Sequence, residues 1–172
     1  MKRMLFTSYR QPDVNLSGST MYRQAYRGII WIDGKLLMIR SEKYGEMKFP
    51  GGGKEKGETT FQALKREIRE ETGYIIKPHP RYFGHTLEYA KDYKGEYDVF
   101  KQESGYYFCE VYPENQGTDY SSYEVEYGYK PVLVTIDEAI RNNEDVPSND
   151  IIPWRERDTR MLHILKEMQN ED

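Results

Sequence analysis

The sequence contains a single cysteine, Cys109, and this scarcity excludes any disulfide bond within the chain. Because an unpaired cysteine usually packs as a small hydrophobic side chain, we expect a buried and unreactive thiol at this position. The sequence also lacks an apolar run long enough to cross a bilayer, and the basic residues among 1–5 precede no apolar segment. We therefore expect no membrane association and no secretory signal, and the cytoplasm is the expected location.

An excess of positive charge is missing as well. The 25 lysines and arginines are outnumbered by 29 aspartates and glutamates, which gives a formal net charge of −4. This balance argues against binding to a nucleic acid backbone, which usually requires a basic surface. It leaves a nucleotide ligand open, because a metal ion can neutralise phosphate locally. The three histidines have no metal-ligand spacing, and no glycine-rich loop precedes a Lys-Ser/Thr pair, so a P-loop is not indicated.

The chain does contain enough apolar material for one folded domain. It has 172 residues, of which 37% are hydrophobic and 31% charged, and no repeat, low-complexity tract or linker divides it. We expect one domain over residues 1–172, with residues 1–23 as an irregular N-terminal arm. The 16 tyrosines are expected mostly in the core or at an interface, where an apolar ring with a polar tip is useful, and they make a homodimer plausible.

Hydrophobic periodicity predicts a mixture of strands and helices, of the α/β or α+β class. Two β-prone runs flank Asp33-Gly34, a pair typical of two-residue hairpin turns. Thr135 and Glu138 have the spacing of a capping box, so a helix should begin there. Residues 113–128 are expected to form a long polar loop. The expected strands cover residues 26–32, 35–39, 47–49, 81–89, 105–112 and 131–136, and further helices are expected over residues 58–71 and around 161–168.

The helix expected over residues 58–71 has an acidic face. Glu67, Glu70 and Glu71 stand at positions i, i+3 and i+4, which lie together on a helix surface. The apolar stripe of this helix lies roughly a quarter turn away, so the helix can bury one side and present carboxylates at a cleft. Such close carboxylates repel one another, and magnesium, which prefers carboxylate and phosphate oxygens, would relieve the repulsion. The alternative is a solvated acidic face with basic neighbours, the usual outcome for paired glutamates on a helix.

The residues around this face favour metal binding. The stretch from Gly52 to Tyr74 resembles the Nudix box, which reads Gly, five residues, Glu, seven residues, and then Arg-Glu-aliphatic-any-Glu-Glu-any-Gly-aliphatic. With each residue type used at roughly 6%, seven chance matches come to the order of one in a billion per window. The one departure is Tyr74, at a packing position where an aliphatic residue is usual. The seven fixed positions are filled by Gly52, Glu58, Arg66, Glu67, Glu70, Glu71 and Gly73.

The resemblance extends to the hairpin and glycine loop before the box and to residues 132–139 after it. It implies the α/β class, as a Nudix-type α/β/α sandwich with a mixed β-sheet. It also implies a hydrolase that cleaves a phosphoanhydride (pyrophosphate) bond in a nucleoside diphosphate linked to another moiety, with Mg²⁺ or Mn²⁺ as cofactor. The implied metal ligands are the Gly51 carbonyl, Glu67, Glu70 and Glu71, one glutamate doubling as the base for water, with Arg66 and Glu58 orienting the acidic face and Gly52 and Gly73 in supporting positions.

A further carboxylate is expected from outside the box. Family members often supply one from the loop before the late strand, which is here the segment 113–128. A helix presents its glutamates from one side only, and a base on another side needs an oxygen within about 3 Å of the water. Glu124 and Glu126 are two apart, so both would face the same way in an extended chain. We favour Glu124 with Glu126 close behind, Glu114 and Asp119 as other candidates, and a solvated acidic loop as the alternative.

The resemblance leaves the function partly open. A non-catalytic Nudix-fold module that senses a nucleotide and a metal-dependent isomerase are the alternatives to a hydrolase, although sensing modules tend to lose box carboxylates that are all present here. The small-molecule substrate stays open among oxidised nucleoside triphosphates, nucleotide sugars, ADP-ribose and dinucleoside polyphosphates. Tyr89 and Tyr93 stand where some members place a substrate-selecting residue, although in a chain with 16 tyrosines chance explains these positions equally well. His85 is a candidate for the cleft, whereas His163 is expected to pack in the final helix.

Overall fold

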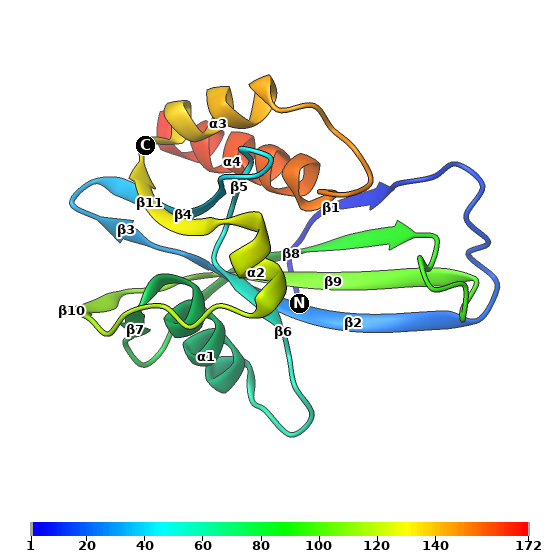
Figure 1. The fold of residues 1–172 in the computed structure, drawn as a ribbon, viewed down its shortest axis with the longest axis horizontal. Helices are drawn as coiled ribbons and strands as arrows, with labels where there is room; N and C mark the ends of the chain where they lie inside the picture. The colour runs from blue at the N-terminus through cyan, green and yellow to red at the C-terminus, as the bar shows by residue number, and fades with distance from the viewer. Residues whose placement is uncertain (1, 172) are drawn as a thin grey trace.

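Five strands form the largest sheet and combine parallel with antiparallel neighbours. The computed structural model describes residues 2–171, and Figure 1 shows this sheet reaching from the centre of the molecule toward the loops that follow β1 and β8. In order across the sheet the strands are β1 (Met4–Tyr9), β8 (Arg81–Ala90), β9 (Val99–Phe108), β2 (Thr20–Ile29) and β6 (Gly51–Gly53). The pairs β1–β8 and β9–β2 are parallel, and the other two pairs are antiparallel.

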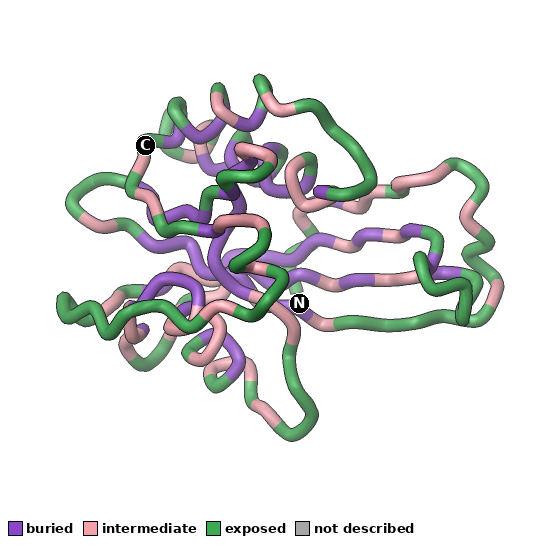
Figure 2. Tube along the Cα trace, viewed as in Figure 1, coloured by how far each residue is buried: buried purple, intermediate pink, exposed green. Residues whose placement is uncertain are grey.

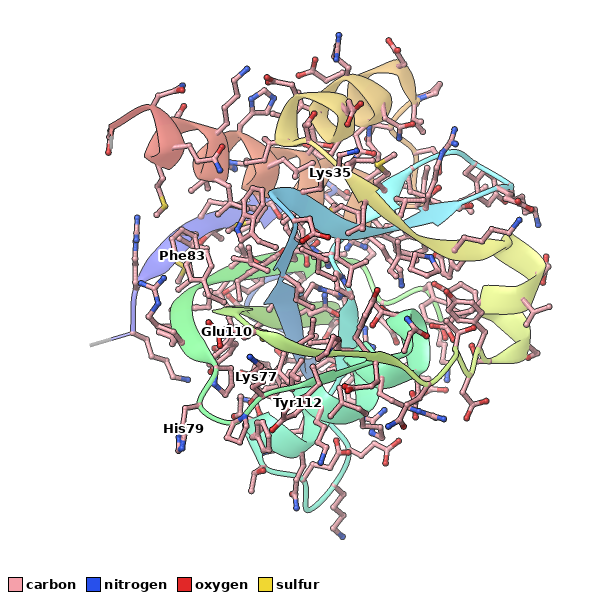
Figure 3. All side chains as sticks on the ribbon, turned by 90° about the vertical axis from the view of Figure 1, so that its left-hand side faces the viewer. Lys35, Lys77, His79, Phe83, Glu110 and Tyr112 are labelled. Atoms are coloured by element: carbon pink, nitrogen blue, oxygen red, sulfur yellow. The ribbon has the colours of Figure 1, made fainter. Side chains whose placement is uncertain are left out.

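A second sheet is built around the expected hairpin. Its turn is Asp33-Gly34, and both residues have positive φ angles of 50° and 76°, as a two-residue turn of this kind requires. The strands are β11 (Tyr129–Val134), β4 (Lys35–Ser41) and β3 (Trp31–Ile32), with β5 (Met47–Lys48) also on β4. A separate pair joins β7 (Tyr74–Ile76) and β10 (Val111–Asn115), and Figure 3 shows Lys77, Glu110 and Tyr112 together beside it and His79 pointing outward.

Helices cover the strands from two sides. Figure 1 shows α1 (Thr60–Thr72) on one side and α3 (Ile136–Asp145) with α4 (Trp154–Glu171) on the other. Along β4, Leu36 and Met38 belong to the core that includes α3 and α4, whereas Leu37 belongs to the core that includes α1, because successive strand side chains alternate faces. Figure 2 shows buried positions concentrated in the middle of the molecule, where the strands and helices meet. The arrangement is the expected α/β/α sandwich with a mixed sheet.

Helix ends follow the capping residues in the sequence. Thr59 accepts from the Gln62 backbone, and the Gln62 side chain accepts from Thr59 N, so α1 begins just after Thr59 rather than at residue 58. Gly73, with φ 81°, ends the helix in the left-handed conformation that glycine tolerates, which confirms the expected stop. The capping box expected at Thr135 and Glu138 is present at the start of α3 and is likewise confirmed.

Three expectations about local structure are wrong. The segment 113–128 is not one loop, because β10 extends to Asn115 and a short helix, α2 (Ser122–Tyr127), follows. The strand expected over residues 105–112 is two strands, since β9 ends at Phe108 and β10 turns away to pair with β7. The N-terminal arm is not irregular throughout, because β1 pairs in parallel with β8 and β2 begins at Thr20. The outcomes for β10 and β1 depend on pairing between distant segments, which local patterns do not encode.

Cys109 and His163 differ in their exposure to solvent. Cys109 is buried, and burial raises the pKa of its thiol to about 12, which agrees with the expected unreactive cysteine. His163 is exposed, and its Nε2 lies 2.9 Å from Glu144 Oε1 on α3, so the packing role expected for it is wrong. Among residues 2–171, no helix has both the length and the apolar character needed to span a membrane.

Candidate active site

Helix α1 presents the three box glutamates beside a cavity of about 300 Å³. The helix buries Leu64 and Ile68 completely against the strands, so its orientation is fixed by packing. Glu67 and Glu70 remain partly exposed on the cavity side, whereas Glu71 is 2% exposed. The carboxylates that the sequence placed on one helix face therefore line one cavity. We call it the carboxylate cavity; its acidic lining residues are Glu67, Glu70, Glu71 and Glu124.

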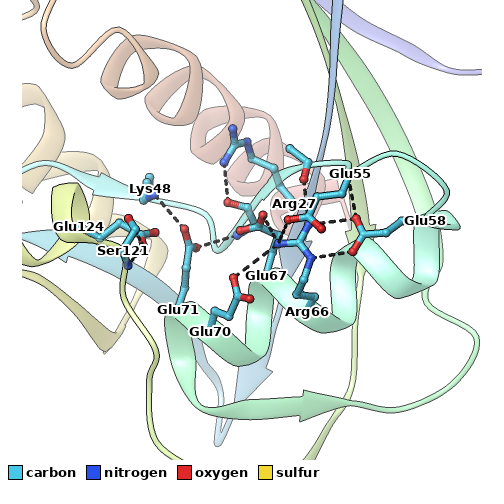
Figure 4. Close-up of polar contacts among 12 residues, drawn as sticks. Arg27, Lys48, Glu55, Glu58, Arg66, Glu67, Glu70, Glu71, Ser121 and Glu124 are labelled. Atoms are coloured by element: carbon cyan, nitrogen blue, oxygen red, sulfur yellow. Dashed lines mark hydrogen bonds and ion pairs between the residues drawn. The ribbon is translucent and has the colours of Figure 1, made fainter.

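Arg66, on α1, contacts Glu67 on the same helix and also Gly53 and Glu58 in the segment before it. Its Nε donates to Glu58 Oε1 at 2.6 Å, and its Nη1 donates to Glu67 Oε1 at 2.7 Å (Figure 4). Nη2 donates to Glu58 Oε2 at 3.0 Å and to the Gly53 carbonyl at 3.1 Å. The hydrogen bonds from Arg66 lower the pKa of Glu58 to about 2. The orienting role implied for Arg66 and Glu58 thus has a direct geometric basis, because the fork fixes the Glu67 carboxylate.

The buried carboxylate of Glu71 accepts hydrogen bonds from a lysine and from a backbone N–H group. Its Oε1 accepts from Lys48 Nζ at 3.0 Å, and its Oε2 accepts from the Gly51 backbone N–H at 2.9 Å. Burial raises the pKa of Glu71 to about 7, and Lys48 opposes this rise. Tyr120 Oη also donates to the Glu71 carbonyl at 2.7 Å, which connects the segment before α2 to the end of α1.

Glu70 is the least constrained of the three glutamates. Its only side-chain partner among the described residues is Arg66 Nη1, at 3.5 Å. Desolvation and the neighbouring Glu67 raise the pKa of Glu70. A carboxylate that is partly desolvated, close to another carboxylate and weakly paired is suited to bind a cation.

The three consecutive glycines leave space that side chains would fill. A Cβ at Gly52 would lie 2.5 Å from Glu67 Oε2, and a Cβ at Gly53 would lie 2.8 Å from Arg23 Nη2. At Gly51, φ is 140° and a Cβ would lie 2.1 Å from the Tyr26 carbonyl oxygen, so this backbone packs directly on β2. Glycine at 52 therefore lets the Glu67 carboxylate approach the β6 backbone.

The residues of this cavity fit a hard divalent cation. The described residues contain no ready-made cluster of three carboxylate, imidazole or thiol groups around one point, because Glu67 turns toward Arg66 and Glu71 toward Lys48. The donor set is nevertheless made of carboxylate oxygens, which Mg²⁺ and Mn²⁺ prefer, and the space at Gly52 accommodates one of them. The Gly51 carbonyl accepts a hydrogen bond from Arg27 Nη1 at 3.2 Å.

The two carboxylates expected from outside the box lie in different places. Glu124 lines the carboxylate cavity, and its Oε2 accepts from Ser121 N and Ser121 Oγ, both at 2.8 Å (Figure 4). Glu126 lies outside the lining of that cavity and pairs with Lys43 at 2.8 Å, with both side chains exposed. The expectation that the two face the same way is wrong, because they stand on the helix α2 and not on an extended segment. Glu114 and Asp119 are exposed.

The residues considered for substrate selection lie mostly elsewhere. His85 is buried in β8, where its Nδ1 lies 2.8 Å from Tyr82 Oη, and it does not line the carboxylate cavity. Tyr89 stacks on Tyr9 with ring centroids 5.2 Å apart. Tyr93 is 88% exposed and borders a second cavity.

An aromatic cavity of about 830 Å³ adjoins the carboxylate cavity. Tyr123 and Trp154 line both cavities, so the two meet at these residues. Tyr127 packs against both rings, with centroids 4.8 Å from Tyr123 and 6.4 Å from Trp154. The Trp154 indole donates to Glu46 Oε1 at 3.0 Å, which fixes the ring. The aromatic residues of this cavity are Tyr93, Phe100, Tyr123, Tyr127 and Trp154.

The site contains basic and aromatic residues that the sequence did not reveal. Lys48, Arg27 and Arg157 line the carboxylate cavity from β5, β2 and α4, and Trp154 joins it to the aromatic cavity. None of these residues belongs to a local motif. The signal in the sequence was a lysine or arginine within an expected strand. Such a residue, if buried, requires a partner of opposite charge.

Comparison with known proteins agrees with this geometry. The NUDIX domain family matches residues 21–155. An ADP-ribose pyrophosphatase of Methanocaldococcus jannaschii is 46% identical over 56 residues, which cover 31% of this chain and 33% of that protein. A Nudix hydrolase of Bacillus subtilis, YvcI, is 41% identical over 51 residues, which cover 29% of this chain and 32% of that protein. The matched stretch thus spans about a third of the length of each relative.

Solved structures share the fold over most of the chain. An ADP compounds hydrolase superposes with a TM-score of 0.57 at 19% identity, covering 87% of this chain and 74% of that one. A NUDIX hydrolase from Nitrosomonas europaea superposes with a TM-score of 0.55 at 18% identity, covering 80% and 88%. These likenesses confirm the expected sandwich with a mixed sheet.

Proposed function

The chain belongs to the Nudix family, and on that premise we propose that it is a metal-dependent hydrolase of a nucleoside diphosphate linked to another moiety. The observation that carries the proposal is the carboxylate cavity, in which the three box glutamates face a group of basic residues. Such a cavity suits a phosphoanhydride, because carboxylates can hold a cation on one side of the phosphates while basic groups neutralise the other.

Different residues of the carboxylate cavity would take different roles in hydrolysis. When bound, Mg²⁺ or Mn²⁺ would neutralise phosphate oxygens and make a water more acidic. Glu67, Glu70, Glu71 and the Gly51 carbonyl would hold the cation, and Arg66 keeps the Glu67 carboxylate in place through its 2.7 Å contact. Glu124 enters from α2, on another side of the cavity from α1, and we assign it the role of accepting the proton of the attacking water.

The proposed substrate class is a nucleotide whose base occupies the aromatic cavity. Tyr123 and Trp154 stand at the boundary of the two cavities, so a ligand with its phosphates among the carboxylates would place its next aromatic group against these rings. The relatives named for ADP-ribose and ADP compounds support a nucleoside diphosphate derivative over other phosphoanhydrides. A cytoplasmic location, which the free buried thiol fits, and a homodimer stay predictions.

A nucleotide-sensing module without activity is the alternative from another functional class. No feature of the described residues favours it, since every box carboxylate is present and Glu67, Glu70 and Glu71 line the cavity. The discriminating experiment measures release of phosphate or mononucleotide from a panel of nucleotide sugars, ADP-ribose, dinucleoside polyphosphates and oxidised nucleoside triphosphates, with and without Mg²⁺. We expect Mg²⁺-dependent release from at least one compound. Binding without turnover for every compound would replace the hydrolase with the sensing module.

A further inference from the structure

Three arginines line the carboxylate cavity together with the box glutamates. Arg23 and Arg27 lie four residues apart on β2 and so share one face of the strand, and Arg157 approaches from α4. We call these three residues the arginine wall. The glycine loop lies beside it, since a Cβ at Gly53 would lie 2.8 Å from Arg23 Nη2. The cavity thus has cationic as well as acidic lining.

Arg157 is fully engaged in internal ion pairs. Its Nε donates to Asp158 Oδ1 at 2.9 Å, and its Nη1 donates to Glu88 Oε2 at 3.2 Å. The two acids also have other donors, because Arg10 lies 2.9 Å from Glu88 Oε1 and Tyr106 Oη lies 2.9 Å from Asp158 Oδ1. Glu88 and Asp158 are thus held by Arg157, Arg10 and Tyr106, and neither carboxylate forms an ion pair with the arginines of β2.

Arg27 differs from Arg157 in lacking an ionic partner. It is 5% exposed, its Nη1 donates to the Gly51 carbonyl at 3.2 Å, and its Nε is buried without any hydrogen-bond partner among residues 2–171. Arg23 is exposed at the cavity mouth and donates to the neutral Gln102 side chain at 2.8 Å. Neither arginine forms an ion pair with a described carboxylate. A buried guanidinium with an unused donor is costly unless an anion completes it.

We propose that the arginine wall binds the diphosphate of the substrate, with Arg27 as the residue that contacts it and Arg23 closing the contact at the cavity mouth. Planar guanidinium groups match phosphate oxygens, and a buried position strengthens the attraction. The proposal rests on the proposed function for the identity of the ligand, and it adds which basic residues of the cavity hold the phosphates. Arg157 is a positioning residue here, since its ion pairs anchor α4.

The test measures binding of inorganic pyrophosphate by calorimetry at low ionic strength in EDTA, so that neither a metal nor turnover is needed. We expect the wild-type protein to bind, Arg27→Gln to raise the dissociation constant at least tenfold, and Arg23→Gln to raise it less. Arg141→Gln, the same charge change at an exposed position on α3, is the matched control and should leave the constant unchanged. Equal affinities for wild type and Arg27→Gln would overturn the proposal, as would no binding by the wild type.

A purely structural role for Arg27 gives a different result. If Arg27 only supports the Gly51 carbonyl, Arg27→Gln lowers the melting temperature in EDTA and leaves pyrophosphate affinity as it was. If Arg27→Gln does not fold, the exposed Arg23→Gln decides, because its loss of affinity is expected in a protein with an unchanged melting temperature. Pyrophosphate binding that depends on Arg27, in a protein that hydrolyses no nucleotide of the panel, would keep the arginine wall and reject the hydrolase.

Discussion

Lys48 Nζ lies 3.0 Å from Glu71 Oε1, and both side chains are buried. The pair connects β5 to the end of α1, and the Gly51 N–H bond to the same carboxylate adds the glycine loop. Burial raises the pKa of Glu71 to about 7, and Lys48 opposes this rise, so the lysine favours the charged form of the carboxylate. A lysine outside the box thereby favours the charged form of a box residue.

Lys48→Met should destabilise the protein far more than Lys43→Met. The first change leaves Glu71 as an uncompensated buried charge, which typically costs about 3 kcal/mol or more. The second removes the exposed Lys43–Glu126 pair, of similar length at 2.8 Å, and should cost less than about 1 kcal/mol. Urea unfolding in EDTA, on the alkaline side of the Glu71 pKa, measures both. Equal losses would show that the Lys48–Glu71 pair is not buried in solution.

Glu70→Gln should lower turnover at least a hundredfold while leaving the fold intact. Glu70 has a single weak side-chain contact, at 3.5 Å from Arg66, so its replacement removes little structure and mainly removes a carboxylate from the cavity. Circular dichroism and turnover at saturating Mg²⁺, on the substrate found in the nucleotide panel, measure the two effects. Wild-type turnover in this variant would exclude Glu70 from the metal ligands.

Glu124→Gln and Glu126→Gln should separate the two candidates on α2. Glu124 lines the carboxylate cavity and Glu126 pairs with Lys43 on the surface, so only the first change is expected to reduce turnover, by about a hundredfold for loss of a general base. A glutamine at 124 can still accept from Ser121, which preserves the cap of α2. Comparable rates in both variants would leave α2 as a spacer beside the site.

The grouping of the three box glutamates could be predicted from the sequence, because all three lie on one helix. Glu67, Glu70 and Glu71 fall within five consecutive positions, and helical periodicity alone brings them together. The arginine wall could not be predicted, because Arg27 and Arg157 come to line one cavity only after β2 and α4 pack into one fold. The contact of Lys48 with Glu71 likewise forms only when β5 approaches the end of α1. Periodicity in the sequence predicts which residues share a face of one helix or strand. Contacts between different helices and strands follow from tertiary packing.

The segment before β11 carries a local signal for a helix start. Ser121 and Glu124 have capping-box spacing, and the structure contains that box at the start of α2. A helix of six residues has little periodicity, so composition favoured a loop. The parallel pairing of β1 with β8 left no comparable signal, because strand register between distant segments depends on what each face buries.

Magnesium should raise the melting temperature of the wild-type protein and have a smaller effect on Glu70→Gln. A ligand that binds only the folded state stabilises it by mass action, and the close Glu67 and Glu70 carboxylates repel each other without a cation. Thermal unfolding across millimolar Mg²⁺, with EDTA as the starting point, measures the shift. An unchanged melting temperature in the wild-type protein would mean that the carboxylates do not form a metal site before substrate binds.

Glu88 should make the protein sensitive to acid. It is 1% exposed, and although its burial alone would raise its pKa, Arg157 at 3.2 Å and Arg10 at 2.9 Å outweigh burial and lower it from the ordinary 4.5. A lowered folded pKa contributes stability above the unfolded value, and that contribution is lost as pH falls through the folded value. Wild type should therefore exceed Glu88→Gln in melting temperature at neutral pH, where the variant leaves two arginines with a neutral partner. The difference should shrink as pH falls below 4.5, whereas Glu110→Gln, at an exposed position, should show no such trend. A constant difference between wild type and Glu88→Gln across this range would mean that Glu88 stabilises α4 by packing and not by its charge.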